Sequence, residues 1–209
     1  MQDNESFTWR IEEKNYDALS KFGTIQDVIG DGNCGVYAAI EGLLNCLIAV
    51  TIDVGKFRKE VHDFVDTHRK EVLTNFTFSG KLKKDGSVRG KRRDDWLSDV
   101  VMKRIWTKGM KYLPSANREN WVTANFHYPV LAVMYDINFV WYDLKDQITY
   151  ATIKIPQGRQ RDHKEKTIEK KGIVKPNDMI AGSVWEKIVI CLHYKNHFMN
   201  LKELLEPNE

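Results

Sequence analysis

Cys34 is the residue of this chain best placed to do chemistry. It follows Asp31-Gly32-Asn33 and precedes an apolar segment that begins at Gly35. Glycines at 30 and 32 can adopt backbone angles that other residues resist, so a tight turn can direct its N–H groups into the space beside the thiol. Helical N–H groups and the helix dipole just after Cys34 would favour a thiolate, the nucleophilic form of cysteine. We therefore expect a nucleophile with an oxyanion-binding loop beside it.

A nucleophilic thiol needs a base, and His197 is the main candidate. It opens the segment His197-Phe198-Met199-Asn200-Leu201, whose composition predicts a strand. His193 is the rival, although a turn at Lys195-Asn196 would place the two histidines on different strands. A Cys–His pair of this kind would cleave an acyl bond through a thioester.

These segments together resemble the ovarian-tumour (OTU) family of cysteine proteases. The resemblance rests on Asp31-Gly32-Asn33-Cys34 with Tyr37 three residues after the cysteine, and on His197-Phe198 at the start of a strand. Between them, Trp121 and the segments 129–136 and 137–143 are similar to the Trp, helix and central strand of that family. The resemblance covers roughly residues 24–201 in the family's order. It implies removal of ubiquitin or a ubiquitin-like protein after the C-terminal Gly-Gly.

In the mechanism that this resemblance implies, Cys34 is the nucleophile, His197 the base, and the loop with Gly32 and Asn33 supplies oxyanion donors. The family usually has Asp or Asn two residues after the His, where this chain has Met199, which cannot hold an imidazole by a strong hydrogen bond. We assign Asp31 as the third catalytic residue, with Asn200 or an acid elsewhere as alternatives. The mechanism implies neither a metal nor another cofactor.

A second departure is Gly35, where the family usually has a larger apolar residue. Glycine weakens a helix start by up to about 1 kcal/mol, yet it would let a substrate backbone approach closely.

Composition sets the broad class. The 209 residues are 42% hydrophobic and carry a formal net charge of +3, which suits one domain with a sizeable core. Three cysteines fit neither a disulfide framework nor a zinc site and favour a reducing, intracellular location. The start has no signal-peptide pattern, and no apolar run is long enough for a membrane span. We expect a soluble monomer, cytoplasmic or nuclear.

Basic residues gather between Lys81 and Arg93, with Asp85 as the only acid there. Such a segment could contact nucleic acid, but no aromatic residues are interleaved for base stacking, so a solvated loop is the preferred interpretation. A second basic stretch, Lys154 to Lys175, is expected to be an exposed insertion.

Hydrophobic periodicity supplies the elements that must position Cys34 and His197. It predicts helices over about 35–49 and 56–73, a helix after Asp94-Asp95, and a helix with Pro129 in its first turn. Branched and aromatic residues predict a hairpin of 137–144 with 148–155, then strands over 185–194 and 197–201.

The fold class predicted is α+β and papain-like, as in OTU proteins: helices packed on a small, mostly antiparallel sheet. Residues 1–23 are predicted to form an N-terminal helix and turn, and residues 24–205 the catalytic domain, with basic insertions at about 80–93 and 156–183. Two other functions stay open. One is an OTU-like module that binds ubiquitin without turnover, and the less favoured one is a nucleic-acid-associated protein.

Overall fold

A computed structural model describes residues 13–68, 122, 124–157, 162–195 and 197–203 of the chain. The helices and strands of these segments have the bounds α1 Glu13–Ser20, β1 Gly23–Gln26, α2 Cys34–Asn45, α3 Val54–Thr67, α6 Ala124–Met134, β2 Asn138–Asp143, β3 Ile148–Gln157, β4 Asp162–Lys171, α7 Pro176–Met179, β5 Ile188–Tyr194 and β6 His197–Glu203.

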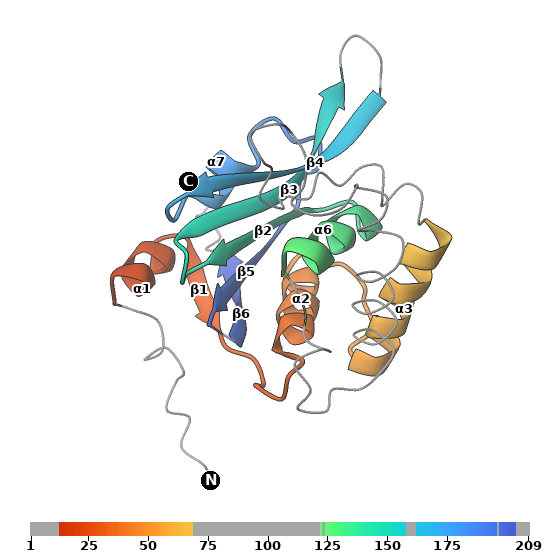
Figure 1. Cartoon of the computed structure of the whole chain (residues 1–209), viewed down its shortest axis with the longest axis horizontal. Helices are drawn as coiled ribbons and strands as arrows, with labels where there is room; N and C mark the ends of the chain where they lie inside the picture. The colour runs from red at the N-terminus through yellow and green to blue at the C-terminus, as the bar shows by residue number, and fades with distance from the viewer. Residues whose placement is uncertain (1–12, 69–121, 123, 158–161, 196, 204–209) are drawn as a thin grey trace, which may run out of the picture.

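One six-stranded sheet organises the fold (Figure 1), in the order β1-β6-β5-β2-β3-β4. Neighbouring strands are antiparallel except β2 and β5, which run parallel. A parallel pair needs a crossover connection, and here the chain between β2 and β5 forms β3, β4 and α7. The α+β class with a mostly antiparallel sheet is confirmed.

Side chains alternate between the two faces of the sheet, so each face has its own hydrophobic core. The larger core packs α2, α3 and α6 on strand residues Phe139, Trp141, Val189, Cys191 and Phe198. The smaller core joins Leu19 of α1 and Met179 of α7 to strand residues Val140, Tyr142, Ile190, Leu192, Met199 and Leu201. The sheet is therefore the middle layer between two sets of helices (Figure 1).

Helix α2 is the element that carries the nucleophile candidate. Its buried residues recur at three- and four-residue steps, among them Val36, Ala39, Ile40 and Leu43. Its contacts are chiefly with β6 and β5. The helix predicted over 35–49 is confirmed in position but ends at Asn45.

Helix α3 begins at a regular cap, where the Asp53 carboxylate accepts a hydrogen bond from the N–H of Lys56 at 2.7 Å. Its buried face includes Val54, Phe57, Val61 and Val65. This helix was predicted over 56–73, and it packs on α2 and α6.

Two predictions about the middle of the chain have different outcomes. The hairpin is confirmed, since β2 and β3 pair from Phe139↔Thr152 to Asp143↔Ile148. Pro129 was predicted in the first turn of its helix, but α6 begins at Ala124 and Pro129 lies inside it. The helix therefore starts earlier than the proline position suggests.

The ends of the sheet contain elements that periodicity left unassigned. Residues 23–26 form β1, which pairs with β6. The basic stretch after Lys154 continues β3 and then forms the edge strand β4, paired with β3 over ten residues. The basic segment 81–93, the helix after Asp94-Asp95 and Trp121 lie outside the described residues.

Candidate active site

Cys34 is the first residue of α2 and lies at the end of a tight turn. Its side chain is buried, with 6% of its surface exposed. Gly32 has φ of +91°, which a residue with a Cβ rarely adopts, so the turn depends on this glycine. Gly30 does not have a positive φ, so only one of the two predicted glycines serves the turn in this way.

His197 is the first residue of β6 and faces two partners. Its imidazole hydrogen-bonds the Cys34 thiol, and its Nε2 lies 2.6 Å from Oδ1 of Asp27. Because Asp27 holds Nε2, the nitrogen left for Cys34 is Nδ1. The His197 side chain is 13% exposed and that of Asp27 26%, so the pair lies at the surface with the imidazole the more buried of the two. The three side chains form a Cys–His–Asp arrangement.

The position of Asp27 follows from the register of β1 and β6. Gln26 pairs with Asn200, so Asp27 and Met199 are the next residues along the two strands. Oδ1 of Asp27 also accepts the N–H of Val28 at 2.9 Å, which fixes the carboxylate beside the ring. The acid that the family motif places two residues after the His thus comes from the neighbouring strand, while Met199 packs in the smaller core.

The assignment of Asp31 as the residue that orients His197 is wrong. The Asp31 carboxylate turns back on its own loop, where Oδ1 accepts the N–H of Asn33 at 2.8 Å and Oδ2 accepts the hydroxyl of Tyr37 at 3.2 Å. Such short-range bonds from an aspartate are what shape a turn. Asp31 therefore shapes the loop before Cys34 and leaves the imidazole to Asp27.

Asn200, the other named alternative, is fully buried on the opposite side of β6 from Met199. Its Nδ2 donates to the Ile190 carbonyl and its Oδ1 accepts from Asn45, each at 2.9 Å. It ties α2 to the sheet through these bonds, while the contact with the imidazole is made by Asp27. The rival histidine, His193, stacks on Phe198 with ring centroids 4.4 Å apart and faces Asp143.

Electrostatics at His197 favour the protonated imidazole. The hydrogen bond with Cys34 raises the pKa of His197 most, burial works against it, and the hydrogen bond and charge of Asp27 raise it further. The net direction is upward from 6.5. An imidazolium that keeps its proton can stabilise a thiolate on Cys34.

The space next to Gly35 is filled by the protein. A Cβ at Gly35 would lie 2.6 Å from Cβ of Val122, closer than side chains approach each other. The expectation that Gly35 admits a substrate backbone is therefore wrong. Val122 occupies the volume that a larger residue at position 35 would take.

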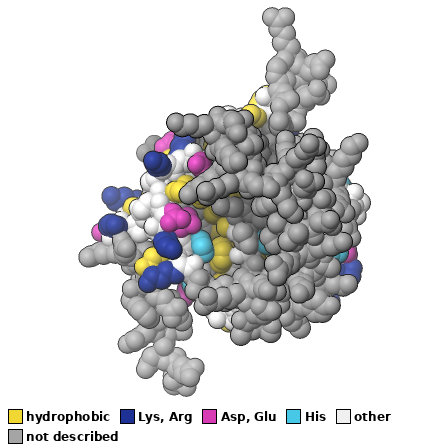
Figure 2. All heavy atoms as spheres, in the orientation of Figure 1, with side chains coloured by type: hydrophobic (Ala, Val, Ile, Leu, Met, Phe, Trp, Pro, Cys, Tyr) yellow, Lys and Arg dark blue, Asp and Glu magenta, His cyan; other side chains and the backbone are white. Residues whose placement is uncertain are grey.

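On the part of the surface in Figure 2 that is not drawn in grey, basic, acidic and hydrophobic side chains are intermixed. Among the described residues, no three side chains of His, Cys, Asp and Glu converge as metal ligands would. No helix in the same part of the chain is long and apolar enough to cross a membrane.

Neither a protein-family model nor a curated protein matches this chain. Among solved structures, it is similar to an OTU deubiquitinase from Wolbachia pipientis wMel bound to ubiquitin, with 14% identity, 88% of this chain and 97% of that chain covered, and a TM-score of 0.44. It is also similar to the viral OTU domain protease from Farallon virus, with 13% identity, 90% and 88% coverage, and a TM-score of 0.44. Both are OTU proteins.

Sequence reasoning missed two residues at this site. Asp27 lies 170 positions from His197, and only the pairing of β1 with β6 brings them together. Arg58 is fully buried and donates two hydrogen bonds to Asn33. The sequence did contain a signal for Arg58: a charged residue stands on the apolar face of α3, one turn before Val61.

Proposed function

We propose that this chain is a cysteine protease that removes ubiquitin or a ubiquitin-like protein from its conjugates. The observation that carries the proposal is the position of the His197 imidazole. It lies between the thiol of Cys34, the first residue of α2, and the Asp27 carboxylate. Nucleophile, base and orienting acid are the three parts that thiol-dependent acyl transfer needs.

In the first half of the reaction, His197 takes the proton of Cys34 and the thiolate attacks the carbonyl carbon of the scissile bond. A bond forms between Sγ and that carbon, and negative charge moves to the carbonyl oxygen. Backbone N–H groups of the loop that ends at Cys34, other than that of Asn33, which donates to Asp31, would bind this oxygen, and one such donor is worth about 3 kcal/mol in measured oxyanion holes.

Collapse of this intermediate breaks the carbon–nitrogen bond, and His197 gives its proton to the leaving amine. In the second half, the neutral imidazole takes a proton from water, and the hydroxide attacks the thioester. Collapse of the second intermediate breaks the carbon–sulfur bond, the acid product leaves, and the proton on His197 returns to the Cys34 sulfur. Asp27 keeps the ring in place through Nε2 during both halves.

The substrate class comes from the sequence resemblance. Its Cys and His motifs belong to enzymes that act after the C-terminal Gly-Gly of ubiquitin, where glycines can thread a narrow channel to the thiol. The partner expected is ubiquitin, polyubiquitin or a ubiquitin-like protein.

A binding module without turnover was the main alternative, and it rested on Met199 in place of an orienting residue. Asp27 supplies a carboxylate to the same imidazole, which removes that reason. The catalytic alternative is the better supported of the two.

The deciding experiment is a reaction of the purified chain with ubiquitin that carries a thiol-reactive electrophile at its C-terminus. We expect a covalent adduct, seen by mass, with the wild type and with a Cys46→Ala control, and none with Cys34→Ala. Cys46 is the fair control because it lies at the other end of α2, where its thiol donates to the Ile188 carbonyl.

Two other outcomes would change the proposed nucleophile or the proposed substrate. An adduct on Cys34→Ala would remove the nucleophile assignment. No adduct with folded wild type, while a control enzyme reacts, would favour a different ubiquitin-like substrate or the binding module.

A further inference from the structure

Arg58 is a buried cation beside the nucleophile's loop that the mechanism above does not use. It lies on the apolar face of α3, where its neighbours along the helix face are Val54, Val61 and Val65, and none of its surface is exposed. A buried guanidinium is costly unless its N–H groups are bonded to acceptors. Its Nε and Nη2 both donate to Oδ1 of Asn33, at 3.1 and 2.8 Å.

Asn33 is the residue before Cys34 and the N-cap of α2. An asparagine at this position ordinarily uses its side-chain oxygen to accept an N–H from the first turn of the helix. Here the side chain makes no such bond, because Arg58 holds its oxygen. Only the backbone carbonyl of Asn33 meets the helix, accepting from the N–H groups of Val36 and Tyr37 at 2.7 and 3.0 Å.

Asn33 is also held from the opposite side. Its N–H donates to the Asp31 carboxylate at 2.8 Å, and the same carboxylate accepts the Tyr37 hydroxyl. Arg58 thus holds the side-chain oxygen of Asn33, while Asp31 holds its backbone N–H and, at 3.5 Å, its side-chain Nδ2. The result is a loop of defined shape directly before the nucleophile.

We propose that Arg58 is a positioning residue that holds the Asn33 side chain away from the start of α2, and so keeps the N–H groups around Cys34 directed at the reacting carbonyl oxygen. This inference rests on the proposed cysteine-protease function. Without Arg58, the Asn33 oxygen can rotate toward the first turn of α2 and change the shape of the loop whose N–H groups the developing negative charge needs.

The charge state of Arg58 fits this role. Burial lowers its pKa to about 10, while the nearby Asp31 carboxylate works in the opposite direction. The guanidinium therefore remains protonated at neutral pH and keeps both hydrogen bonds to Asn33.

The first test compares Arg58→Met and Arg58→Lys with the wild type on a fluorogenic ubiquitin amide. We expect Arg58→Met to lower kcat about tenfold to a hundredfold with KM within about twofold, since an oxyanion donor acts in the transition state. Arg58→Lys should recover part of the loss. Tyr142→Phe is the control, because it removes a buried hydrogen bond to the Val174 carbonyl on the other face of the sheet.

The second test asks whether Arg58 acts through Asn33. We expect Asn33→Ala added to Arg58→Met to cause no further loss of kcat, because the side chain that would rotate toward α2 is then absent. Independent, multiplying losses would overturn the proposal. The proposal would also be overturned if kcat fell in proportion to the melting temperature in every variant, including Tyr142→Phe.

A third test needs no substrate and separates failure of this inference from failure of the proposed function. The pH profile of Cys34 alkylation by iodoacetamide, followed by peptide mass, should be the same for Arg58→Met as for the wild type. By nuclear magnetic resonance, the Arg58 Nε–H should exchange slowly with solvent in the wild type and at least about tenfold faster in Asn33→Ala.

If the wild type gives no adduct with the ubiquitin electrophile, the proposed function fails. The exchange of the Arg58 Nε–H still decides whether Arg58 holds the Asn33 side chain. An unchanged exchange rate in Asn33→Ala would overturn the inference even in an active enzyme.

Discussion

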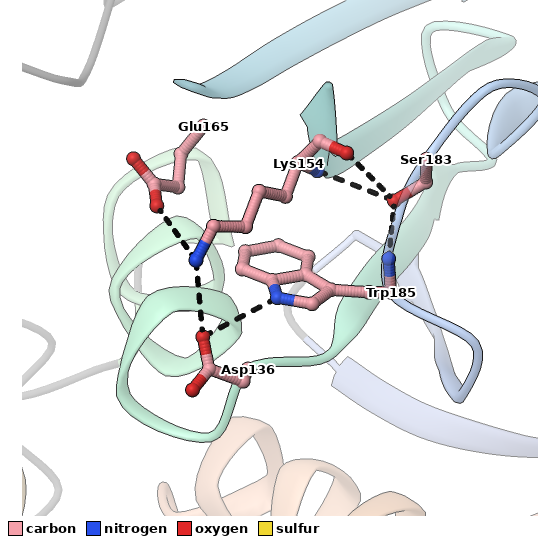
Figure 3. A network of polar contacts seen from close by, with 5 residues as sticks. All are labelled: Asp136, Lys154, Glu165, Ser183 and Trp185. Carbon is pink, nitrogen blue, oxygen red and sulfur yellow. Dashed lines mark hydrogen bonds and ion pairs between the residues drawn. The ribbon is translucent and has the colours of Figure 1, made fainter. Parts of the chain in front are cut away.

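Two clusters of charged and polar side chains lie at opposite ends of the same sheet, and they differ in whether their side chains can transfer a proton. At the end where β5 passes into β6, Asp27, His197 and Cys34 form the candidate active site. At the other end, before β2 begins, Lys154 lies between Asp136 and Glu165, with nitrogen–oxygen distances of 3.5 and 3.6 Å (Figure 3).

The second cluster is closed. The Lys154 ammonium also lies 5.5 Å from the ring centroid of Trp185, whose indole N–H donates to Asp136 at 3.3 Å. Ser183 completes it by bonding the backbone of Lys154 and the N–H of Trp185 (Figure 3). Both carboxylates pair with the Lys154 ammonium, so this cluster can hold β2, β3 and β4 together. It contains no imidazole or thiol that could serve as base or nucleophile.

The active-site cluster differs in exposure and in composition: the side chains of His197 and Asp27 are 13% and 26% exposed, whereas that of Asp136 is 74% exposed. Its central group is an imidazole, the side chain whose proton equilibrium lies nearest neutral pH, and its neighbour is a thiol. One carboxylate, that of Asp27, orients the ring. The kinds of groups therefore distinguish the candidate site from a structural ion pair: an imidazole beside a thiol can transfer a proton, whereas a lysine between two carboxylates holds strands together.

The sharpest test of this difference is the loss of one carboxylate from each cluster. Asp27→Ala should lower kcat about a hundredfold to a thousandfold, because His197 loses the partner that fixes its ring and supports its positive charge. Asp136→Ala should leave kcat within about twofold of the wild type. Steady-state kinetics on a fluorogenic ubiquitin amide measures both.

Equal activity losses in these two variants would erase the distinction between the clusters. An active Asp27→Ala would mean that another group orients His197.

Asp31→Ala should have a smaller effect than Asp27→Ala. It removes the acceptor for the Asn33 N–H and the Tyr37 hydroxyl, and so loosens the loop without touching the imidazole. We expect about a tenfold fall in kcat while the ubiquitin electrophile still labels Cys34. A complete loss of labelling would assign Asp31 a direct part at the thiol.

The pH dependence should distinguish the clusters in a third way. Because Asp27 raises the pKa of His197, Asp27→Asn should move the alkaline limb of kcat/KM to lower pH. A protonated His197 also stabilises the fold: that contribution is complete below about pH 6.5 and is lost as pH rises through the higher pKa of the folded state.

Denaturant unfolding across this range measures the stability part, and Asp27→Asn should weaken its pH dependence. Lys154→Met offers the comparison, since its cluster contains no histidine. An alkaline limb that stays in place in Asp27→Asn would contradict the role of Asp27.

The smallest expected effect is on stability at the closed cluster. Lys154→Met should lower the free energy of unfolding by about 1 kcal/mol, because two carboxylates lose a partly exposed cation. The activity should not change. Lys166→Met, at an exposed position of β4, is the matched control, and an equal loss there would mean that the cluster adds nothing.

Much of this molecule could be predicted from local pattern. The helix after Cys34, the hairpin of β2 and β3, and the strands before and after the Lys195 turn follow from periodicity, because each depends on residues close in sequence. The Asp31–Cys34 turn follows from residue type, since Gly32 takes the positive φ that the turn requires. Cys34 and His197 were identified as partners by their chemistry, and the structure brings them together.

What only the tertiary structure decided is which distant side chains complete that pair. Asp27 reaches His197 through the pairing of β1 with β6, Arg58 reaches Asn33 through the packing of α3 on α2, and Val122 fills the space at Gly35. None of these contacts has a local signature, because a strand register and a helix packing are fixed by the sum of many burials across the core rather than by the residues that meet. The sequence therefore determined the chemistry that this chain can offer, and the fold determined which acid and which cation serve it.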